Sequence, residues 1–181
     1  PYQDELPPSP TEYGAAVAKA LSPLKARGVT IVCEPGRVIV GNAGVLLTRT
    51  LYLKEGEAKN FVIVDAAMND LIRPALYDSY HRIEAVGVHD ASTLFIADVV
   101  GPICETSDFF ARDRELSWRP VTGDLVAIMS AGAYGASMAS NYNTRPRPAE
   151  VLVDGASYRV VRRRETIEEL VQAEEVFDST Q

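Results

Sequence analysis

The sequence contains few cysteines and few histidines. Among its 181 residues, the cysteines are Cys33 and Cys104 and the histidines are His81 and His89. Two cysteines so far apart in the chain form no disulfide framework, and a reducing compartment such as the cytoplasm is therefore expected. The four residues also lack the close spacing of zinc ligands, so we expect no bound metal.

Long hydrophobic runs and an excess of positive charge are absent too. No apolar stretch approaches the roughly 20 residues of a membrane-spanning helix, and the first residues do not read as a signal peptide. Lys and Arg number 18 against 25 Asp and Glu, which gives a formal net charge of -7. A duplex nucleic-acid binder needs a basic face to displace counterions. We therefore predict neither a membrane nor a nucleic-acid partner.

What remains is the composition of an ordinary globular protein, with 46% hydrophobic and 24% charged residues. A chain of 181 residues can form one domain with a substantial core, or one domain plus a fragment of another. The sequence begins at Pro1, not at methionine. Processing, or a position in the later part of a longer polypeptide, is the expected explanation.

Residues 1–37 read as a helix, a buried strand and a polar loop. Ser9 and Glu12 have the spacing of a capping box, and Gly28 is a fitting stop, while Pro23 should kink or restart the helix. Val29–Cys33 is a short apolar run of the kind buried on both faces of a parallel sheet. This order is that of the closing unit of an α/β barrel, in which sites lie at the C-terminal ends of the strands.

Residues 38–181 change to short strand-like runs separated by turns, which indicates a β-barrel or sandwich. The runs are Val38–Val40, Val45–Leu47, Thr50–Leu53, Phe61–Val64, His81–Val86, Leu94–Val100 and Asp124–Met129, followed by a hairpin around Asp154-Gly155. Between them, Phe109–Pro120 reads as a polar connection. A second capping box, Thr166 to Glu169, predicts a closing helix near 166–176. The fold class is thus mainly β with an α/β remnant, divided at 1–37 and 38–181.

The stretch from Gly101 to Asp108 places a thiol beside two carboxylates at the end of a strand. Cys104 is followed directly by Glu105, and Asp108 comes three residues later. A thiol in this setting can take part in proton transfer. The alternative is that Cys104 is a small buried hydrophobe, as free cysteines often are.

Two loops carry candidate anion-binding residues. Glu34 and Arg37 follow the first predicted strand, where they form either a surface ion pair or a proton acceptor and an anion clamp. Tyr134 lies within a run of small residues, Ser130–Ser137, whose backbone N–H groups could approach a phosphate. The same glycines also suit an ordinary tight turn.

A short helical turn is predicted within Asp65–Tyr77. Asn69 or Asp70 would cap it, which brings Arg73 and Tyr77 onto one face at i and i+4. A guanidinium and a phenol on one face can grip a carboxylate. Alternatively, Tyr77 packs in the core and Arg73 is solvated.

Taken in order, these motifs closely resemble those of bacterial diaminopimelate decarboxylases from about Val29 to Glu165. The motifs are Glu34-Pro35-Gly36-Arg37, Asp65–Tyr77, Gly101-Pro102-Ile103-Cys104-Glu105, Ser130-Ala131-Gly132-Ala133-Tyr134-Gly135 and Asn141-Tyr142-Asn143. The resemblance implies a dimeric, pyridoxal-phosphate-dependent enzyme in which an α/β barrel is joined to a β-domain. Such an enzyme converts meso-diaminopimelate to lysine and carbon dioxide.

The resemblance also implies roles for individual residues. The cofactor would be held by Glu34 at its pyridine nitrogen, by Pro35, Gly36 and Arg37 around its phosphate, and by Tyr134. Substrate would be bound by Arg37, Arg73, Tyr77, Glu105 and Tyr134. Cys104 would be the catalytic proton donor, delivered with Glu105 into the site of the neighbouring subunit.

One feature of the resembled enzymes has no counterpart. Their Schiff-base lysine lies upstream of every motif found here, and Lys19, Lys25, Lys54 and Lys59 do not sit in the corresponding motif. We therefore expect this chain alone to be inactive without the missing N-terminal half. The alternatives are a related decarboxylase of ornithine, arginine or a polyamine precursor, and a non-catalytic dimerisation β-domain.

Overall fold

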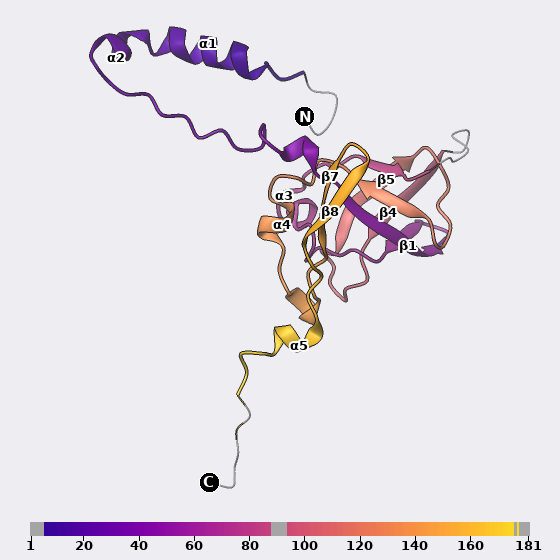
Figure 1. Cartoon of the computed structure of the whole chain (residues 1–181). Coiled ribbons are helices and arrows are strands. Elements are labelled where there is room, and N and C mark those ends of the chain that lie inside the picture. Colours follow the sequence, from indigo (N-terminus) through magenta and orange to yellow (C-terminus); the bar gives the residue numbers. More distant parts are fainter. Residues whose placement is uncertain (1–5, 88–93, 176, 178–181) are drawn as a thin grey trace.

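The computed structural model of the chain describes residues 6–87, 94–175 and 177. His89 and the last position of the predicted 166–176 helix lie outside the described residues. The chain forms a body of β-strands, from which an N-terminal helical segment and a C-terminal tail extend in different directions (Figure 1).

The N-terminal segment contains two short helices, as predicted. Helix α1 (Pro10–Ala20) begins with the capping box, in which the Ser9 hydroxyl accepts the Glu12 N–H and the Glu12 carboxylate accepts the Ser9 N–H. Helix α2 (Ser22–Ala26) restarts with Pro23 in its first turn. Gly28 follows at a φ of 78°, a left-handed conformation that favours glycine and ends the helix.

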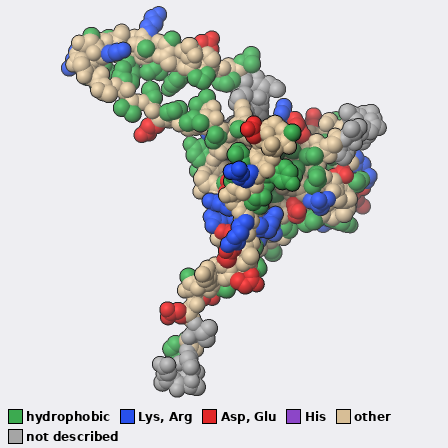
Figure 2. Space-filling model, in the orientation of Figure 1, with side chains coloured by type: hydrophobic (Ala, Val, Ile, Leu, Met, Phe, Trp, Pro, Cys, Tyr) green, Lys and Arg blue, Asp and Glu red, His purple; other side chains and the backbone are tan. Residues whose placement is uncertain are grey.

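Two strands predicted next to these helices are wrong. Residues 29–33 are extended but unpaired with any other strand among the described residues, and residues 37–40 form turns. A buried strand needs a partner for its N–H and C=O groups and a covering layer for its side chains. Here Val32 is 79% exposed, and hydrophobic side chains are visible along this segment in Figure 2.

The centre of the molecule is a six-stranded sheet. Its strands are β1 (Leu46–Lys54), β2 (Phe61–Val64), β3 (Ile83–Ala85), β4 (Phe95–Val100), β5 (Phe109–Leu116) and β6 (Leu125–Ile128). Their spatial order is β3-β6-β1-β2-β4-β5, and β2 pairs with β4 in parallel while the other neighbours are antiparallel. The mainly β domain is thereby confirmed, and the two runs predicted near residue 50 form one strand.

Strand β5 lies where the sequence predicted a polar connection, so that prediction is wrong. It pairs with β4 at the edge of the sheet, with Phe110 and Leu116 fully buried and Arg112 and Glu115 exposed. The run of charged residues from Arg112 to Glu115 made the segment look like a loop. Beyond the strand, Trp118 is buried as well.

Buried apolar side chains from five strands and the connections beside them form one core cluster. Its members are Val62, Val64, Ala66, Leu71, Ile83, Phe95, Ala97, Val99, Phe110, Ala111, Leu116, Trp118, Val126 and Ile128. Several short helices lie in the segments that flank these strands. These are η1 (Gly41–Ala43), α3 (Arg73–Tyr77), α4 (Gly135–Met138) and η2 (Tyr142–Thr144).

The last elements are a separate hairpin and one helical turn. The predicted hairpin is confirmed, with β7 (Glu150–Asp154) paired to β8 (Ser157–Arg162) and Gly155 at a positive φ in the turn. Helix α5 (Ile167–Leu170) starts at the predicted capping box on Thr166, but it is shorter than expected. None of the helices in the described part of the chain is long and apolar enough to cross a bilayer.

Candidate functional site

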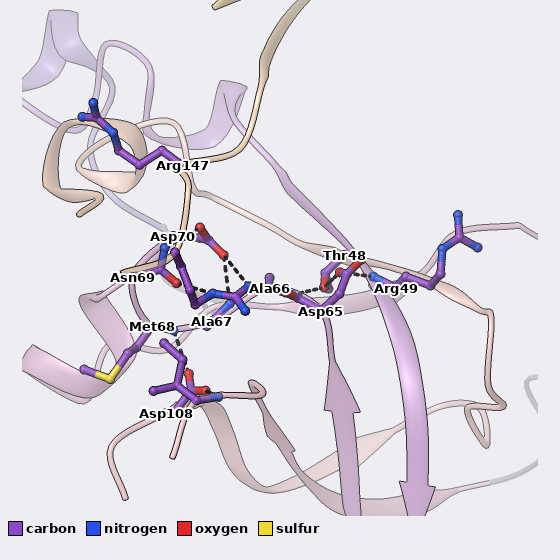
Figure 3. Close-up of polar contacts among 12 residues, drawn as sticks. Thr48, Arg49, Asp65, Ala66, Ala67, Met68, Asn69, Asp70, Asp108 and Arg147 are labelled. Carbon is purple, nitrogen blue, oxygen red and sulfur yellow. Dashed lines mark hydrogen bonds and ion pairs between the residues drawn. The ribbon is translucent and has the colours of Figure 1, made fainter. Parts of the chain in front are cut away.

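The loop between β4 and β5, Gly101–Asp108, is closed by a buried carboxylate. Asp108 is only 4% exposed, and its two oxygens accept N–H groups from Met68 and Ile103, each at 2.7 Å. Its backbone also accepts the Gly101 N–H at 3.1 Å and donates to the Glu105 carbonyl at 3.0 Å. Figure 3 shows Asp108 reaching up to the Met68 backbone. The loop is thus fixed to the turn that follows β2.

At the tip of this loop, Cys104 is exposed, so its interpretation as a buried hydrophobe is wrong. Glu105 next to it is half-buried. The Glu105 carboxylate accepts the Tyr142 hydroxyl at 3.1 Å through one oxygen and the Ser107 N–H at 3.2 Å through the other. The hydrogen bond to this negatively charged group raises the pKa of Tyr142, and Cys104 adds to the shift. The arrangement presents a thiol and an oriented carboxylate side by side.

The turn of residues 65–70 joins the neighbouring segments. Asn69 is fully buried, and its amide donates to the Ser140 carbonyl at 3.2 Å, while its backbone carbonyl accepts the Ser140 N–H at 2.9 Å. Arg145 donates to the Asn69 side-chain oxygen at 3.0 Å and to the Asp65 carbonyl at 2.7 Å. Asp70, also buried, accepts the Ala67 N–H, and burial raises the pKa of Asp70. Figure 3 shows Asp70 beside the Ala67 backbone of this turn.

The second group of predicted residues gathers around Arg73, at the start of α3. Its side chain is buried, with the guanidinium carbon 5.6 Å from the Tyr77 ring centre and 5.5 Å from that of Tyr134. A Cβ added at Gly36 would lie 3.1 Å from the Tyr134 hydroxyl. The predicted pairing of Arg73 with Tyr77 is confirmed, whereas a solvated Arg73 and a core-packed Tyr77 are wrong.

The structure therefore assembles the predicted residues into two groups. One is Cys104 with Glu105, and the other is Gly36 with Arg73, Tyr77 and Tyr134. Glu34, Pro35 and Arg37 are exposed on the segment that leads into the sheet. The predicted cap of α3 by Asn69 or Asp70 is wrong, because Ile72 occupies the N-cap, while the Asn69 side chain bonds to Ser140 and Arg145 and that of Asp70 to Ala67.

Sequence reasoning missed four residues that hold these groups in place: Asp108, Asn69, Arg145 and Tyr142. The sequence identified Asp108 only as a second carboxylate near Cys104, and it identified Tyr142 only as part of the Asn141–Asn143 motif. The positive φ values of Asn143 and Thr144 show that their segment is a tight bend, and the Asn141–Asn143 motif was a signal for it. The bonds from Asp108 and Arg145 cross 40 and 76 residues, so local sequence gave no sign of them.

Comparison with known proteins agrees with the observed sheet domain. The family model described as pyridoxal-dependent decarboxylase, C-terminal sheet domain, matches residues 15–132. The chain belongs to this family of pyridoxal-dependent decarboxylases, as their C-terminal sheet domain.

Two curated relatives are diaminopimelate decarboxylases. The one from Neisseria meningitidis serogroup B is 60% identical over 93% of this chain and 39% of its own length. The one from Pseudomonas aeruginosa is 56% identical over 97% of this chain and 41% of its own length. The chain therefore spans about two-fifths of the length of these relatives.

Solved structures give the same result. Diaminopimelate decarboxylase from M. jannaschii matches with a TM-score of 0.89 and 37% identity over 97% of this chain and 41% of its own. The Helicobacter pylori enzyme complexed with L-lysine matches with a TM-score of 0.84 and 43% identity over 94% of this chain and 41% of its own. An arginine decarboxylase of a Chlorella virus, at 20% identity and a TM-score of 0.65 over 74% of this chain and 36% of its own, shares the fold.

Proposed function

We propose that this chain is the C-terminal part of a diaminopimelate decarboxylase, which converts meso-diaminopimelate to L-lysine and carbon dioxide. The observation that carries the proposal is the exposed Cys104 beside a Glu105 carboxylate that Tyr142 orients. The 60% identity to a diaminopimelate decarboxylase supports the choice of substrate. A substrate with an amino acid group at each end needs both a cationic and an anionic contact, and Arg73 and Glu105 provide them.

The residues present fit pyridoxal phosphate. The Gly36 backbone lies against the Tyr134 hydroxyl, so that a side chain at position 36 would fill the space beside that phenol. We propose that Gly36, Arg37 and Tyr134 hold the phosphate side of the cofactor, with Pro35 shaping the loop. Glu34, exposed on the same loop, would face the pyridine nitrogen and favour its protonated form. The cofactor, when bound, supplies the electron sink for loss of carbon dioxide.

The chain's own residues then bind the substrate and return a proton. Arg73, close to the rings of Tyr77 and Tyr134, has a guanidinium fork suited to the far carboxylate. Glu105 accepts the distal ammonium. Cys104, exposed beside Glu105, donates a proton to the carbon that has lost carbon dioxide.

We further propose that the active assembly is a homodimer in the cytoplasm, in which Cys104 and Glu105 enter the site of the partner subunit. The chain alone would be inactive, since the Schiff-base lysine belongs to the N-terminal half that the related enzymes carry. Two exposed free thiols suit a reducing compartment. Assembly with that half would also cover the exposed apolar segment of residues 29–40.

The test is to co-express the chain with the N-terminal half of a close relative and to measure carbon dioxide release from meso-diaminopimelate, ornithine and arginine. We expect release from diaminopimelate, a visible absorbance band of lysine-bound cofactor in the complex, and neither for the 181-residue chain alone. Release from ornithine or arginine instead would favour the related decarboxylases.

The Cys104→Ala variant separates catalysis from assembly. The proposal predicts a loss of turnover of about a hundredfold or more with the dimer preserved, since general acid catalysis typically contributes that much. A non-catalytic dimerisation domain predicts the reverse, namely intact turnover and weaker association. Sedimentation analysis beside the kinetic assay distinguishes the two.

A further inference from the structure

We propose that Asp108 is a positioning residue for proton return: its carboxylate fixes the Gly101–Asp108 loop, and with it Cys104, relative to the turn that leads into Arg73. This inference rests on the proposed function, because it assigns a purpose to the fixed loop. Asp108 itself contacts neither the cofactor nor the substrate in the proposed site. It acts through the backbone of the loop that carries Cys104.

Both oxygens of Asp108 are used on two different segments. One accepts the N–H of Ile103, the residue directly before Cys104, and the other accepts the N–H of Met68 in the turn after β2. A carboxylate that accepts backbone N–H groups forms charge-assisted bonds, which are about twice as strong as neutral ones. The carboxylate therefore links the loop of the thiol to a turn 40 residues earlier in the chain.

The surroundings leave Asp108 little alternative position. The residue is 4% exposed, and a Cβ added at Gly101 would collide with its carboxylate. The absence of a side chain at position 101 thus makes room for the carboxylate next to the backbone. A buried carboxylate without hydrogen-bond partners costs free energy. The Asp108 side chain therefore stays where it can accept both N–H groups.

The turn that Asp108 binds also holds the other site-forming residues of this chain, so one subunit's contribution to its own site and its contribution of Cys104 to the partner's site share one support. From Met68 the chain continues to Asn69, which binds the Ser140 backbone two residues before Tyr142, and then to Arg73. One short segment, Met68 to Arg73, therefore fixes the loop of Cys104, lies next to the segment of Tyr142, and carries Arg73 itself. Loss of the hydrogen bond from Met68 to Asp108 should free the Gly101–Asp108 loop from that segment. Arg73 should keep its place beside Tyr77 and Tyr134.

An asparagine at position 108 tests this link with almost no change of shape. Its amide group would face one of the two N–H donors, and two donors cannot bond to each other. Burial raises the pKa of the Asp108 carboxyl, while the two N–H bonds oppose that shift. Removal of the charge alone is thus tolerable for folding, whereas removal of one acceptor releases the loop.

Asp98 on β4 provides a matched control. It is 8% exposed, it accepts the Asp113 N–H at 2.7 Å, and it pairs with Lys59 at 3.1 Å, all outside the Gly101–Asp108 loop. Asp98→Asn therefore removes a buried, bonded carboxylate from the same sheet. It should cost stability but leave the position of Cys104 unchanged.

The experiment uses the complete enzyme, formed by this chain with the N-terminal half, and deuterated water. For D108N we expect kcat to fall by about a hundredfold with KM within about twofold, because misplacement of a catalytic group by about 1 Å has an effect of this size. Deuterium should also lose its preference for one face of the protonated carbon, since solvent replaces the thiol as donor. D98N should retain both kcat and the facial preference.

A second readout needs no turnover. In the 181-residue chain, D108N should speed hydrogen exchange at the Met68 and Ile103 amides, and D98N should not. If the complete wild-type enzyme released carbon dioxide from no substrate, the proposed function would fail, and amide exchange alone would decide whether Asp108 holds the loop. Unchanged exchange in D108N, or unchanged facial preference in an active D108N enzyme, would overturn the inference.

Gly101→Ala covers the case in which D108N does not fold. Its added Cβ displaces the same carboxylate while leaving the charge in place. The expected pattern is again a lower kcat, a nearly constant KM and a loss of facial preference. A G101A enzyme with wild-type selectivity would contradict the role of Asp108.

Discussion

At the scale of single residues, each oxygen of the Glu105 carboxylate accepts a hydrogen bond from a different segment. Ser107, from its own loop, donates a backbone N–H, and Tyr142, from η2, donates a hydroxyl 37 residues away. Because both oxygens are already hydrogen-bonded, the Glu105 side chain loses less conformational entropy when it binds a ligand. The Tyr142 hydroxyl is thus placed to govern how well Glu105 binds a cation.

Tyr142→Phe should weaken substrate binding more than turnover. In the complete enzyme we expect KM for diaminopimelate to rise about fivefold, with kcat within about twofold, since one hydrogen bond at a partly exposed site contributes about 1 kcal/mol. Steady-state kinetics measures both constants. Tyr158→Phe, which removes a hydroxyl from a residue 78% exposed on β8, is the control and should change neither. A fall in kcat alone would show that Tyr142 acts on the proton transfer instead.

At the scale of elements, Glu165 ties the end of β8 to the loop that contains η2. One carboxylate oxygen accepts the Asn141 amide at 2.7 Å and the Arg147 N–H at 2.8 Å, and the other accepts the Arg147 guanidinium. These bonds, the Arg147 side chain foremost, lower the pKa of Glu165 to about 2. The ionised form is the one that holds the segments together.

The loss of folding stability at acidic pH should therefore depend on Glu165. Because its folded pKa is about 2, below the ordinary value of 4.5, its contribution is complete above about pH 4.5 and is lost as the pH falls toward 2. Glu165→Gln should be less stable than wild type at neutral pH and should lose less stability across that window. Urea unfolding at several pH values measures this. Arg147→Gln should flatten the curve in the same way, and two variants with wild-type acid curves would contradict the assignment.

The elements also show which features local sequence can predict. The capping boxes at Ser9 and Thr166 were predictable because donor and acceptor lie three residues apart. Strand β5 was not, because its buried residues do not alternate: Phe109–Ala111 are buried in a row, Arg112 and Glu115 are exposed, and bulges interrupt its pairing with β4. The predicted strand Val29–Cys33 failed for the opposite reason, since apolar composition does not supply a pairing partner.

The candidate site also contains residues that local sequence predicts and residues that it does not. Cys104, Glu105 and the Arg73–Tyr77 pair were found because their spacing is local and matched a family resemblance. The residues that hold them, Asp108 and Arg145, act on backbone groups of distant segments. Every residue except proline has a backbone N–H, and nothing in the identity of a residue shows which carboxylate its N–H will bind.

At the scale of the whole molecule, the N-terminal segment and the sheet body are nearly independent. Residues 6–35 are exposed or half-buried throughout, and no residue of α1 or α2 is buried. Figure 1 shows the two helices held away from the strands. Gly36, at the end of this segment, lies beside Tyr134 of the body. The predicted division at 1–37 and 38–181 can be tested on this basis.

Removal of residues 1–33 should leave the sheet domain folded. Since the described residues of that segment bury little apolar surface, we expect the free energy of unfolding to change by no more than about 0.5 kcal/mol, as for changes at exposed positions. Thermal unfolding followed by far-UV circular dichroism measures this, and amide spectra should show the core strands unchanged. The shortened chain should also aggregate less, because the exposed Val29 and Val32 are gone. A large drop in the unfolding midpoint would mean that the segment belongs to the folding unit of the sheet.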